Sequence, residues 1–250
     1  FGLFPHAALM FRRGDVSVAK ESVQVQIPLD LAQSAASPAP WGISPYNALV
    51  EQNRIEGALV DTADAAPQAA PGTKVLQASD KPSAPEDLRQ SDTGQIWRSV
   101  KQRIGRINSP RSQAVFGYLG DAGAVSTDDL AVTCRTGFAT LALSSLSDSP
   151  IRTSERLLLT TVGRAENTGL TYNLMRTKAV SVGKGPILCE PIRAQVSIRT
   201  TQREMEVWTI GADGKRLKQV PTRYEAGQLL FEVGTDTNTL YYELSVPEPA

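Results

Sequence analysis

The sequence predicts a mainly β protein: an antiparallel β-sandwich with one short helical segment and an N-terminal arm. Three observations lead to this prediction. Short apolar segments succeed one another through the second half of the chain, clusters of Gly, Ser, Asp and Asn separate them, and several segments alternate apolar with polar residues. Short strands in such a series are typical of two antiparallel sheets that bury their alternate residues against each other.

The strand expected at the centre of the fold is the run Leu157–Val162, within SERLLLTTVGRAENTG at 154–169. The run is short, apolar and partly β-branched, which is typical of a strand buried on both faces. It leads into the polar residues Arg164, Glu166 and Asn167. We expect these three to form a structural corner.

Further strands are expected wherever apolar residues alternate or cluster between turn signals. Residues 170–185 are expected to be irregular, because Gly183 and Gly185 interrupt them. Pro28 places the first strand at a sheet edge, or ends it there. The last hairpin is expected to pair 229–233 with 240–244 across 234–238. The other expected strands cover 23–29, two segments within 95–108 around a turn near 100–102, 113–119, 130–134, 138–146, 192–198, 205–210 and 216–220.

The chain is expected to comprise three regions. Residues 1–40 form an N-terminal arm with an edge strand, 41–90 a helix and an Ala/Pro-rich connector, and 91–250 the sandwich. The helix is expected over 45–60, with Ser44 as its N-cap and Pro45 in its first turn. The chain begins with Phe and shows no signal-peptide pattern, so we expect a processed product or a piece of a longer chain.

Composition narrows the function classes. The chain has 250 residues, with 26 Lys plus Arg and 26 Asp plus Glu, so its formal net charge is zero. This balance gives no general attraction to nucleic acid or to an anionic membrane. Its hydrophobic content of 41% argues against wholesale disorder. The sequence has no run approaching the roughly 18 apolar residues of a membrane-spanning helix.

The two cysteines, Cys134 and Cys189, leave two alternatives open. A disulfide between them would close a long loop and stabilise the fold by about 4 kcal/mol in the chain-entropy model. Two buried free thiols are the other alternative. The localisation is left open, and the disulfide would favour a periplasmic or extracellular protein.

No motif in the sequence assigns a catalytic residue, a cofactor or a metal. There is no Gly-rich phosphate loop, no G-x-S-x-G elbow and no zinc-ligand spacing. Glu166 and Glu190 are the carboxylates most embedded in apolar sequence, and an ion pair with Arg164 or Arg193 is favoured over catalysis for them. His6 is expected to be a packed or surface residue, because no nucleophile lies near it in the sequence.

Three aromatic residues are candidates for carbohydrate contact: Trp97, Trp208 and Tyr241. Aromatic faces stack on the C–H groups of sugar rings, so an exposed row on one sheet would indicate a polysaccharide partner. Packing within the core or on the sheet surface is the more ordinary role for such residues.

Several longer segments together resemble a known region of certain bacterial glycoside hydrolases. This is the region that follows the catalytic (β/α)8 barrel in large enzymes of the cellulase and β-galactosidase clan. The resemblance covers nearly the whole chain and is weakest at 32–90 and 170–184, while Cys134 and residues 61–72 have no counterpart in it. The segments are FRRGDV at 11–16, SDTGQIWRS at 91–99, NSPRSQAVFGYLG at 108–120, SERLLLTTVGRAENTG at 154–169 and GPILCEPIRAQVSI at 185–198.

The resemblance implies an accessory role. FRRGDV would be the chain leaving the barrel, and the remainder would pack against a catalytic barrel chain or domain that holds the two catalytic glutamates. The chain would then be a fragment or subunit of a glycoside hydrolase that is not catalytic alone. Two other classes remain alternatives: a carbohydrate-binding module, and a structural or assembly β-protein, which an exposed apolar patch would favour.

Overall fold

The computed structural model describes residues 2–28, 52–60, 69–77, 87–234 and 239–247, and the chain divides into two compact units. Unit 1 comprises residues 1–16 and 102–250. Unit 2 comprises residues 17–101. The division differs from the boundaries expected at 40 and 90, because the N-terminal residues belong to the unit that contains the sandwich.

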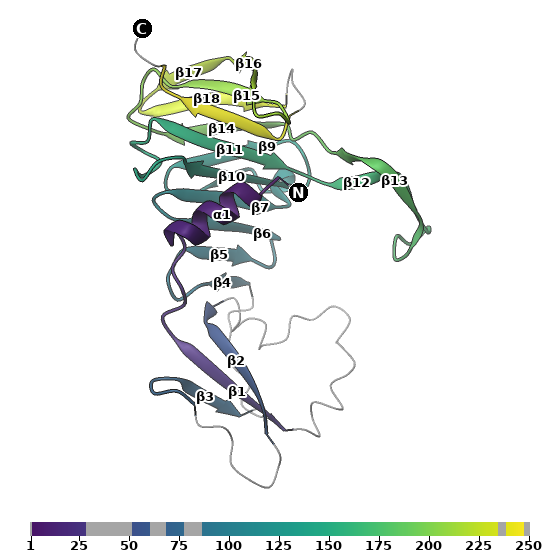
Figure 1. Cartoon of the computed structure of the whole chain (residues 1–250). Helices are drawn as coiled ribbons and strands as arrows, with labels where there is room; N and C mark the ends of the chain where they lie inside the picture. Colours follow the sequence, from purple (N-terminus) through teal and green to yellow (C-terminus); the bar gives the residue numbers. More distant parts are fainter. Residues whose placement is uncertain (1, 29–51, 61–68, 78–86, 235–238, 248–250) are drawn as a thin grey trace. The chain divides into compact units, whose positions relative to one another are not determined.

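Unit 1 is an antiparallel β-sandwich, as the sequence predicted (Figure 1). One sheet runs in the order β6-β7-β10-β11-β19-β15-β16 and the other in the order β8-β9-β14-β18-β17. The strands of the first sheet are β6 (Ile104–Asn108), β7 (Ser112–Gly117), β10 (Ala139–Ser145), β11 (Arg156–Val162), β15 (Glu206–Ile210), β16 (Arg216–Val220) and β19 (Tyr241–Ser245). Those of the second are β8 (Ala124–Ser126), β9 (Leu130–Cys134), β14 (Ala194–Arg199), β17 (Thr222–Glu225) and β18 (Gln228–Val233), and a 3-10 turn, η1 (Leu119–Asp121), precedes β8.

The core lies between these two sheets. In the first sheet β11 is central, because β10 pairs with it on one side and β19 on the other. The prediction for the run Leu157–Val162 is therefore confirmed. Alternate residues of each strand point inward and are excluded from water, which supplies the main stabilisation of such a fold. The fully buried side chains include Leu141, Leu143, Leu157, Leu159, Tyr242 and Leu244 from the first sheet, and Leu130, Ile198 and Leu229 from the second.

The N-terminal segment is a helix, α1 (Phe4–Arg13), where the sequence predicted only an arm. Pro5 lies in its first turn, where the missing N–H costs nothing. Gly14 ends the helix in the left-handed conformation, with φ of 62°. Arg12 and Arg13 lie in the last turn, where cations interact favourably with the helix dipole. The helix packs against β10, across the first sheet (Figure 1).

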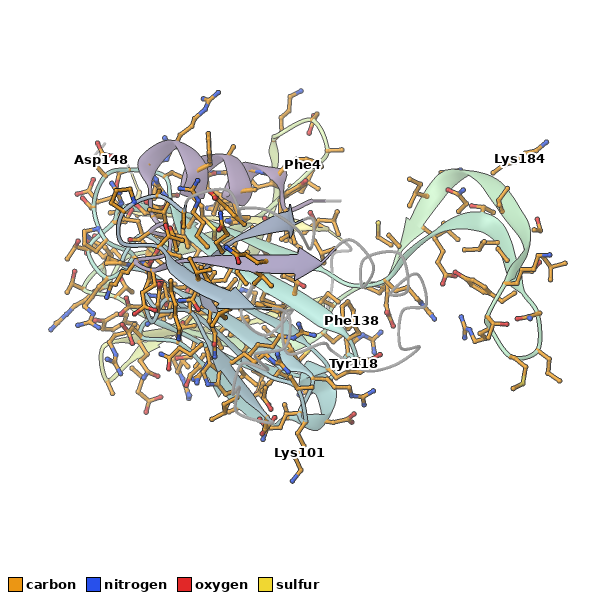
Figure 2. The ribbon with its side chains drawn as sticks, turned by 90° about the horizontal axis from the view of Figure 1, so that it is seen from below. Phe4, Lys101, Tyr118, Phe138, Asp148 and Lys184 are labelled. Atoms are coloured by element: carbon orange, nitrogen blue, oxygen red, sulfur yellow. The ribbon has the colours of Figure 1, made fainter. Side chains whose placement is uncertain are left out.

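A long hairpin, β12 (Ala165–Tyr172) and β13 (Ala179–Cys189), projects from the sandwich (Figures 1 and 2). The expectation that 170–185 would be irregular is therefore wrong. Gly183 does mark a special backbone position, with φ of +66°, but it lies within the strand. The pairing continues through two register shifts, between Asn167 and Thr168 and between Thr171 and Tyr172. A glycine within a strand often marks a bulge or another irregular site, so it does not by itself end the strand.

The last two strands do not form the expected hairpin. β18 pairs with β14 and β17 in the second sheet, whereas β19 pairs with β11 and β15 in the first. The chain crosses from one sheet to the other between Val233 and Tyr241. Alternation shows that two strands are half-buried, but it does not distinguish a hairpin from two strands that face each other across a core.

Unit 2 contains two small sets of strands. β1 (Ser22–Pro28) lies between β2 (Arg54–Val60) and β3 (Lys74–Gln77), parallel to both. β1 is thus central rather than an edge strand, and Pro28 is its last residue. β4 (Leu88–Gln90) and β5 (Ile96–Ser99) form an antiparallel pair. The helix expected over 45–60 is wrong for Arg54–Val60, which is strand β2, and residues 45–51 lie outside the described residues.

Candidate functional site

The side of α1 that faces the sheet carries a buried histidine, with Leu9 and Met10 half-buried one turn further along. His6 is buried, with Nδ1 2.8 Å from the Ser144 hydroxyl and Nε2 2.8 Å from the Thr160 hydroxyl. Both hydroxyls are themselves buried, on β10 and β11. Burial lowers the pKa of His6 from 6.5 to about 4, because the charged imidazolium would be taken out of water. His6 is therefore a neutral packed residue at pH 7, one of the two roles expected from the sequence.

A buried carboxylate follows the helix and continues this network. Asp15 accepts a hydrogen bond from the Ser112 hydroxyl at 2.8 Å, and Ser112 lies 2.9 Å from the Ser144 hydroxyl. Arg13 Nη2 lies 2.6 Å from one carboxylate oxygen of Asp15, and Arg111 Nε lies 2.9 Å from the other. Two arginines and a serine thus hold one buried charge, as a buried carboxylate requires.

The arginines also bind the turns at the end of the sheet. Arg13 donates from Nη1 to the carbonyl oxygens of Ser145, at 2.8 Å, and Ser147, at 3.0 Å. Arg111 donates back to the carbonyl oxygen of Arg13 at 3.0 Å. The segment that follows α1 is therefore fixed to β7, to β10 and to the turn after β10.

Hydroxyl, imidazole and carboxylate groups here do not form a hydrolytic site. In a Ser-His-Asp triad the imidazole lies between the nucleophile and the acid. In this network two serines separate His6 from Asp15, so the acid cannot orient the imidazole. Ser112 and Ser144 are also fully buried, and no substrate can reach them. The network is an anchor for the helix.

The opposite side of α1 is apolar and exposed. Phe4 is 79% exposed and Phe11 is 89% exposed, and Ala7 and Ala8 between them are also exposed. These four residues recur at the spacing of one helical face. Figure 2 labels Phe4 at the beginning of the helix. A surface helix normally buries its apolar side, so the exposed apolar stripe on the outer side of α1 is unusual for a helix that lies on a sheet.

The structure brings two of the three aromatic candidates to one sheet face. Trp208 lies opposite Glu243, and Tyr241 is two residues from Glu243 on β19, so the side chains of Trp208 and Tyr241 share a face. Both are half-buried. Trp97 belongs to β5 of unit 2.

Charged groups occupy the space around Trp208. Its indole N–H donates to Glu206 at 2.9 Å, and the Arg216 guanidinium lies 5.5 Å from its ring centroid. Arg216 and Arg156 both pair with Glu243, at 2.8 and 3.1 Å. The hydrogen bond from Arg216 is the largest of the effects that hold the pKa of Glu243 below its usual range. Trp208 is thus tied into an ionic network.

A hollow of about 340 Å³ lies beside Tyr241, between β15, β19 and the end of β13. Its lining includes Glu190, Ile210, Leu217 and the exposed Cys189. Glu190, one of the two carboxylates singled out from the sequence, therefore faces this hollow. The other, Glu166, lies 3.7 Å from Arg164, which is the expected ion pair. The corner expected for Arg164, Glu166 and Asn167 is wrong, because Glu166 and Asn167 lie within β12 and pair with β13. Asn167 donates from its side-chain amide to the carbonyl oxygen of Val182 at 3.0 Å.

Both cysteines are free thiols. Cys134 is buried on β9 and lies 3.2 Å from the carbonyl oxygen of Thr136, and burial raises the pKa of its thiol. Cys189 is exposed at the end of β13. The structure therefore has neither the disulfide nor the pair of buried thiols, and the localisation that depended on the disulfide loses its support. The described residues contain no cluster of His, Cys, Asp or Glu able to hold a metal, and no helix among them is long and apolar enough to span a membrane.

An exposed aromatic pair that the sequence did not indicate, Tyr118 and Phe138, packs edge to face with ring centroids 5.6 Å apart (Figure 2). The Arg103 guanidinium lies 3.9 Å from the centroid of Tyr118. Gly117 makes this arrangement possible: a Cβ there would lie 2.2 Å from the Arg103 carbonyl oxygen. The glycine before Tyr118 was the only sequence signal, because the two rings are twenty residues apart.

Comparison of the chain with protein-family models, curated proteins and solved structures found no match. The site must therefore be interpreted from its own geometry.

Proposed function

We propose that this chain is the accessory β-sandwich portion of a glycoside hydrolase, C-terminal to a (β/α)8 catalytic barrel, and not catalytic alone. The catalytic glutamates would belong to the barrel. The barrel would pack on the outer side of α1. This places the docking surface next to FRRGDV at 11–16, the segment that resembles a chain leaving such a barrel.

The observation that carries the proposal is the exposed apolar stripe on the outer side of α1. The inner side of the helix is held by buried hydrogen bonds and ion pairs through His6, Arg13 and Asp15. Its outer side leaves Phe4 and Phe11 exposed. Burial of a phenylalanine side chain gains about 1.5–3 kcal/mol, so covering both would contribute about 3–6 kcal/mol to docking. An aromatic stripe on a fixed helix is the kind of surface that anchors another folded domain.

The polar network gives the docking surface a defined orientation. A helix held by apolar contacts alone can rotate or slide, because such contacts are non-directional. The hydrogen bonds from His6 to Ser144 and Thr160 fix which side of α1 faces outward. We regard the network as the device that presents the two phenylalanines to the barrel.

The test begins with the protein as the cell contains it. An antibody raised against the chain is used to isolate the native protein, whose intact mass, peptide map and glycosidase activity are then measured. The expected result is a polypeptide, or a tight complex, that contains a (β/α)8 barrel and hydrolyses glycosides, whereas the isolated chain is inactive on the same glycosides. A native protein that matches this chain alone, or turnover by the isolated chain, contradicts the proposal.

Two substitutions then locate the docking surface. Phe11→Glu in the native enzyme places a charge on the proposed interface, so we expect the two domains to hold together less strongly. In thermal unfolding, the β-sandwich should then unfold in a separate transition at a lower temperature. The control is Leu217→Glu, which changes another exposed apolar residue of unit 1 on β16. Equal effects of the two variants would show that α1 has no special role.

A carbohydrate-binding module is the second candidate, because Trp208 and Tyr241 share one face of the sheet. The ionic groups around Trp208 argue against it, since a sugar would have to displace Arg216 from the ring. Titration of the isolated chain with polysaccharides, followed by tryptophan fluorescence, distinguishes the two candidates. A saturable shift that Tyr241→Ala abolishes would favour the binding module.

A further inference from the structure

The turn at the end of the β12–β13 hairpin exposes two large apolar side chains. The hairpin projects from the sandwich, and Figure 2 labels Lys184 on it, away from the other strands. In its turn Leu174 is 98% exposed and Met175 is 78% exposed. Turns usually carry Gly, Pro, Asn, Asp or Ser, each of which suits the turn backbone. Two adjacent apolar side chains here bury little surface within the folded chain, so we interpret this turn as a contact surface.

The turn is held in one conformation by its own hydrogen bonds. The backbone N–H of Arg176 donates to the carbonyl oxygen of Asn173 at 2.9 Å, which places the two apolar residues at the centre of a β-turn. The side-chain Oδ1 of Asn173 accepts from the backbone N–H of Thr177, at 2.8 Å, and of Lys178, at 3.2 Å. Three backbone donors are thus satisfied within the turn. A segment that enters a lipid surface needs this, because an unpaired N–H is costly in an apolar medium.

The charges of the chain are distributed unevenly, and this hairpin is basic. Residues 167–189 contain Arg176, Lys178 and Lys184 and no Asp or Glu. The whole chain has 26 basic and 26 acidic residues, so the rest of it has 23 basic residues against 26 acidic ones. All three cations are exposed, and none of them has an ion-pair partner among the described residues. Their charge is therefore available to an anionic partner, although the chain as a whole is neutral.

Apolar, cationic and aromatic groups follow one another from the apex of the hairpin toward its base. Leu174 and Met175 form the apex, and Arg176 and Lys178 lie directly beside it. The Arg176 guanidinium lies 5.2 Å from the ring centroid of Tyr172, the last residue of β12. Tyr172 is two residues from Leu174, which is about 7 Å at the rise of a strand. Tyrosine and long cationic side chains both favour the headgroup layer of a membrane.

We infer that the end of this hairpin inserts into the surface of an anionic lipid membrane. The apolar apex, Leu174 and Met175, enters the boundary between headgroups and acyl chains, and the two cations beside it bind the lipid headgroups. Interfacial segments bury their apolar residues to a depth of about 5–10 Å, which extends from the apex to Tyr172. Strand residues nearer the base, such as Val182, stay in water and take no part. This role is independent of the proposed function.

A protein partner fits these observations less well. Leu174 and Met175 are largely exposed, so nothing in the chain fixes their rotamers. A protein pocket has to order both side chains, and the entropic cost is high for methionine. A fluid lipid surface accepts them in any rotamer. It also presents anionic groups on every side, so the cations need no single defined partner.

The experiment measures binding of the 250-residue chain to lipid vesicles by cosedimentation. One set of vesicles is phosphatidylcholine alone and the other also contains phosphatidylserine, both in about 0.1 M salt, where the Debye length is about 10 Å. We expect binding to the anionic vesicles to be at least about 10-fold stronger, because each basic residue near the surface contributes about 5-fold. In about 1 M salt, where the Debye length is about 3 Å, this preference should fall below about 3-fold.

Two matched pairs of variants locate the contact. Leu174→Ser should weaken binding by about 10-fold, since it removes much of the apolar surface that inserts. Its control is Leu217→Ser on β16, where the leucine is 59% exposed and also lies between two basic residues, and this variant should change binding by less than about 2-fold. Lys178→Ala should weaken binding by about 5-fold. Its control is Lys215→Ala, at an exposed lysine of the sandwich, with an effect below about 2-fold.

Leu174→Trp tests whether the apex enters the lipid. Tryptophan favours the membrane interface, so this variant should keep its binding, and brominated lipids should quench the added fluorescence. A chain that does not bind anionic vesicles overturns the inference, and so does binding that Leu174→Ser and Leu217→Ser weaken equally. A chain that leaves vesicles unbound but forms a dimer in sedimentation, and loses the dimer in Leu174→Ser, overturns it in favour of a second copy.

Discussion

Helix α1 and the β12–β13 hairpin both expose apolar side chains, but they are supported in opposite ways. The inner side of α1 is held by a network that reaches from His6 to Asp15 through two buried serines. The hairpin stands clear of the sandwich, and its strands are exposed along most of their length. Exposure on a fixed element and exposure on a projecting element have different physical consequences.

The two surfaces differ in how strongly their stability is coupled to that of the sandwich. The α1 stripe is presented by a part of the core, so removing its anchor should destabilise the whole sandwich. A two-stranded hairpin is marginally stable by itself, so changes in it should stay local until a partner covers it. Paired substitutions, one in each region, can separate these two cases.

The largest effect is expected at Asp15. Asp15→Ala leaves the Arg13 and Arg111 guanidiniums without their buried carboxylate, and we expect it to lower the free energy of unfolding by about 3–5 kcal/mol. The control is Asp148→Ala, since Asp148 is 96% exposed and lies 3.6 Å from the same Arg111. That variant should stay within about 0.5 kcal/mol. Urea denaturation measures both, and equal losses would show that the network does not anchor the fold.

The second-largest effect is expected in the pH dependence of the unfolding free energy. His6 has a pKa of about 4 in the folded chain and 6.5 when unfolded, so between these values the unfolded state binds more protons. Stability should therefore be complete above pH 6.5, fall by about 3 kcal/mol as the pH drops to 4, and lose nothing further from this group below that.

The measurement is the difference in unfolding free energy between the chain and His6→Asn at each pH. The difference removes the contributions of the carboxylates, which titrate in both proteins. A constant difference from pH 7 to pH 4 would mean that His6 titrates normally and is not buried.

Substitution of two glycines tests the same comparison between the sandwich and the hairpin through the backbone. Gly117→Ala places a Cβ 2.2 Å from the Arg103 carbonyl oxygen at φ of +115°, and should lower stability by about 2–3 kcal/mol. Gly183→Ala meets a similar obstacle in the hairpin, 2.4 Å from the Thr168 carbonyl oxygen at φ of +66°. It should change the main unfolding transition by less than about 0.5 kcal/mol, because the hairpin can rearrange without the sandwich. Loss of the same free energy in both variants would make the hairpin part of the cooperative unit.

The sequence predicted the sandwich because its signal is local. Alternation along β9, β14 and β15, and the apolar run of β11, follow from the faces that these strands bury. The sequence predictions fail where the structure of a segment depends on the strand with which it pairs. Arg54–Val60 carries part of a helical stripe, but it forms a strand because β1 pairs with it in parallel. β18 and β19 alternate as a hairpin would, but they pair in different sheets.

The candidate site was harder to predict, because its groups meet only in the fold. His6 and Thr160 are 154 positions apart, and Asp15 and Ser112 are 97 apart. No spacing rule connects them. The ion pair of Arg164 with Glu166 was predictable, since the two residues are only two positions apart. Trp208 and Tyr241, selected as candidates for carbohydrate contact, share one sheet face, but the arginines around Trp208 come from β16 and β11.

The smallest effect is expected at the tip of the hairpin. Leu174 is 98% exposed, so Leu174→Ala removes no buried surface from the isolated chain and should leave its unfolding free energy within about 0.5 kcal/mol. Leu143→Ala makes the same chemical change on β10, where the side chain is fully buried, and should cost about 2–5 kcal/mol. Thermal and urea unfolding of the two variants, at a concentration where the chain is monomeric, check the pair. A clear loss at Leu174 under these conditions would mean that the tip of the hairpin packs against its own chain.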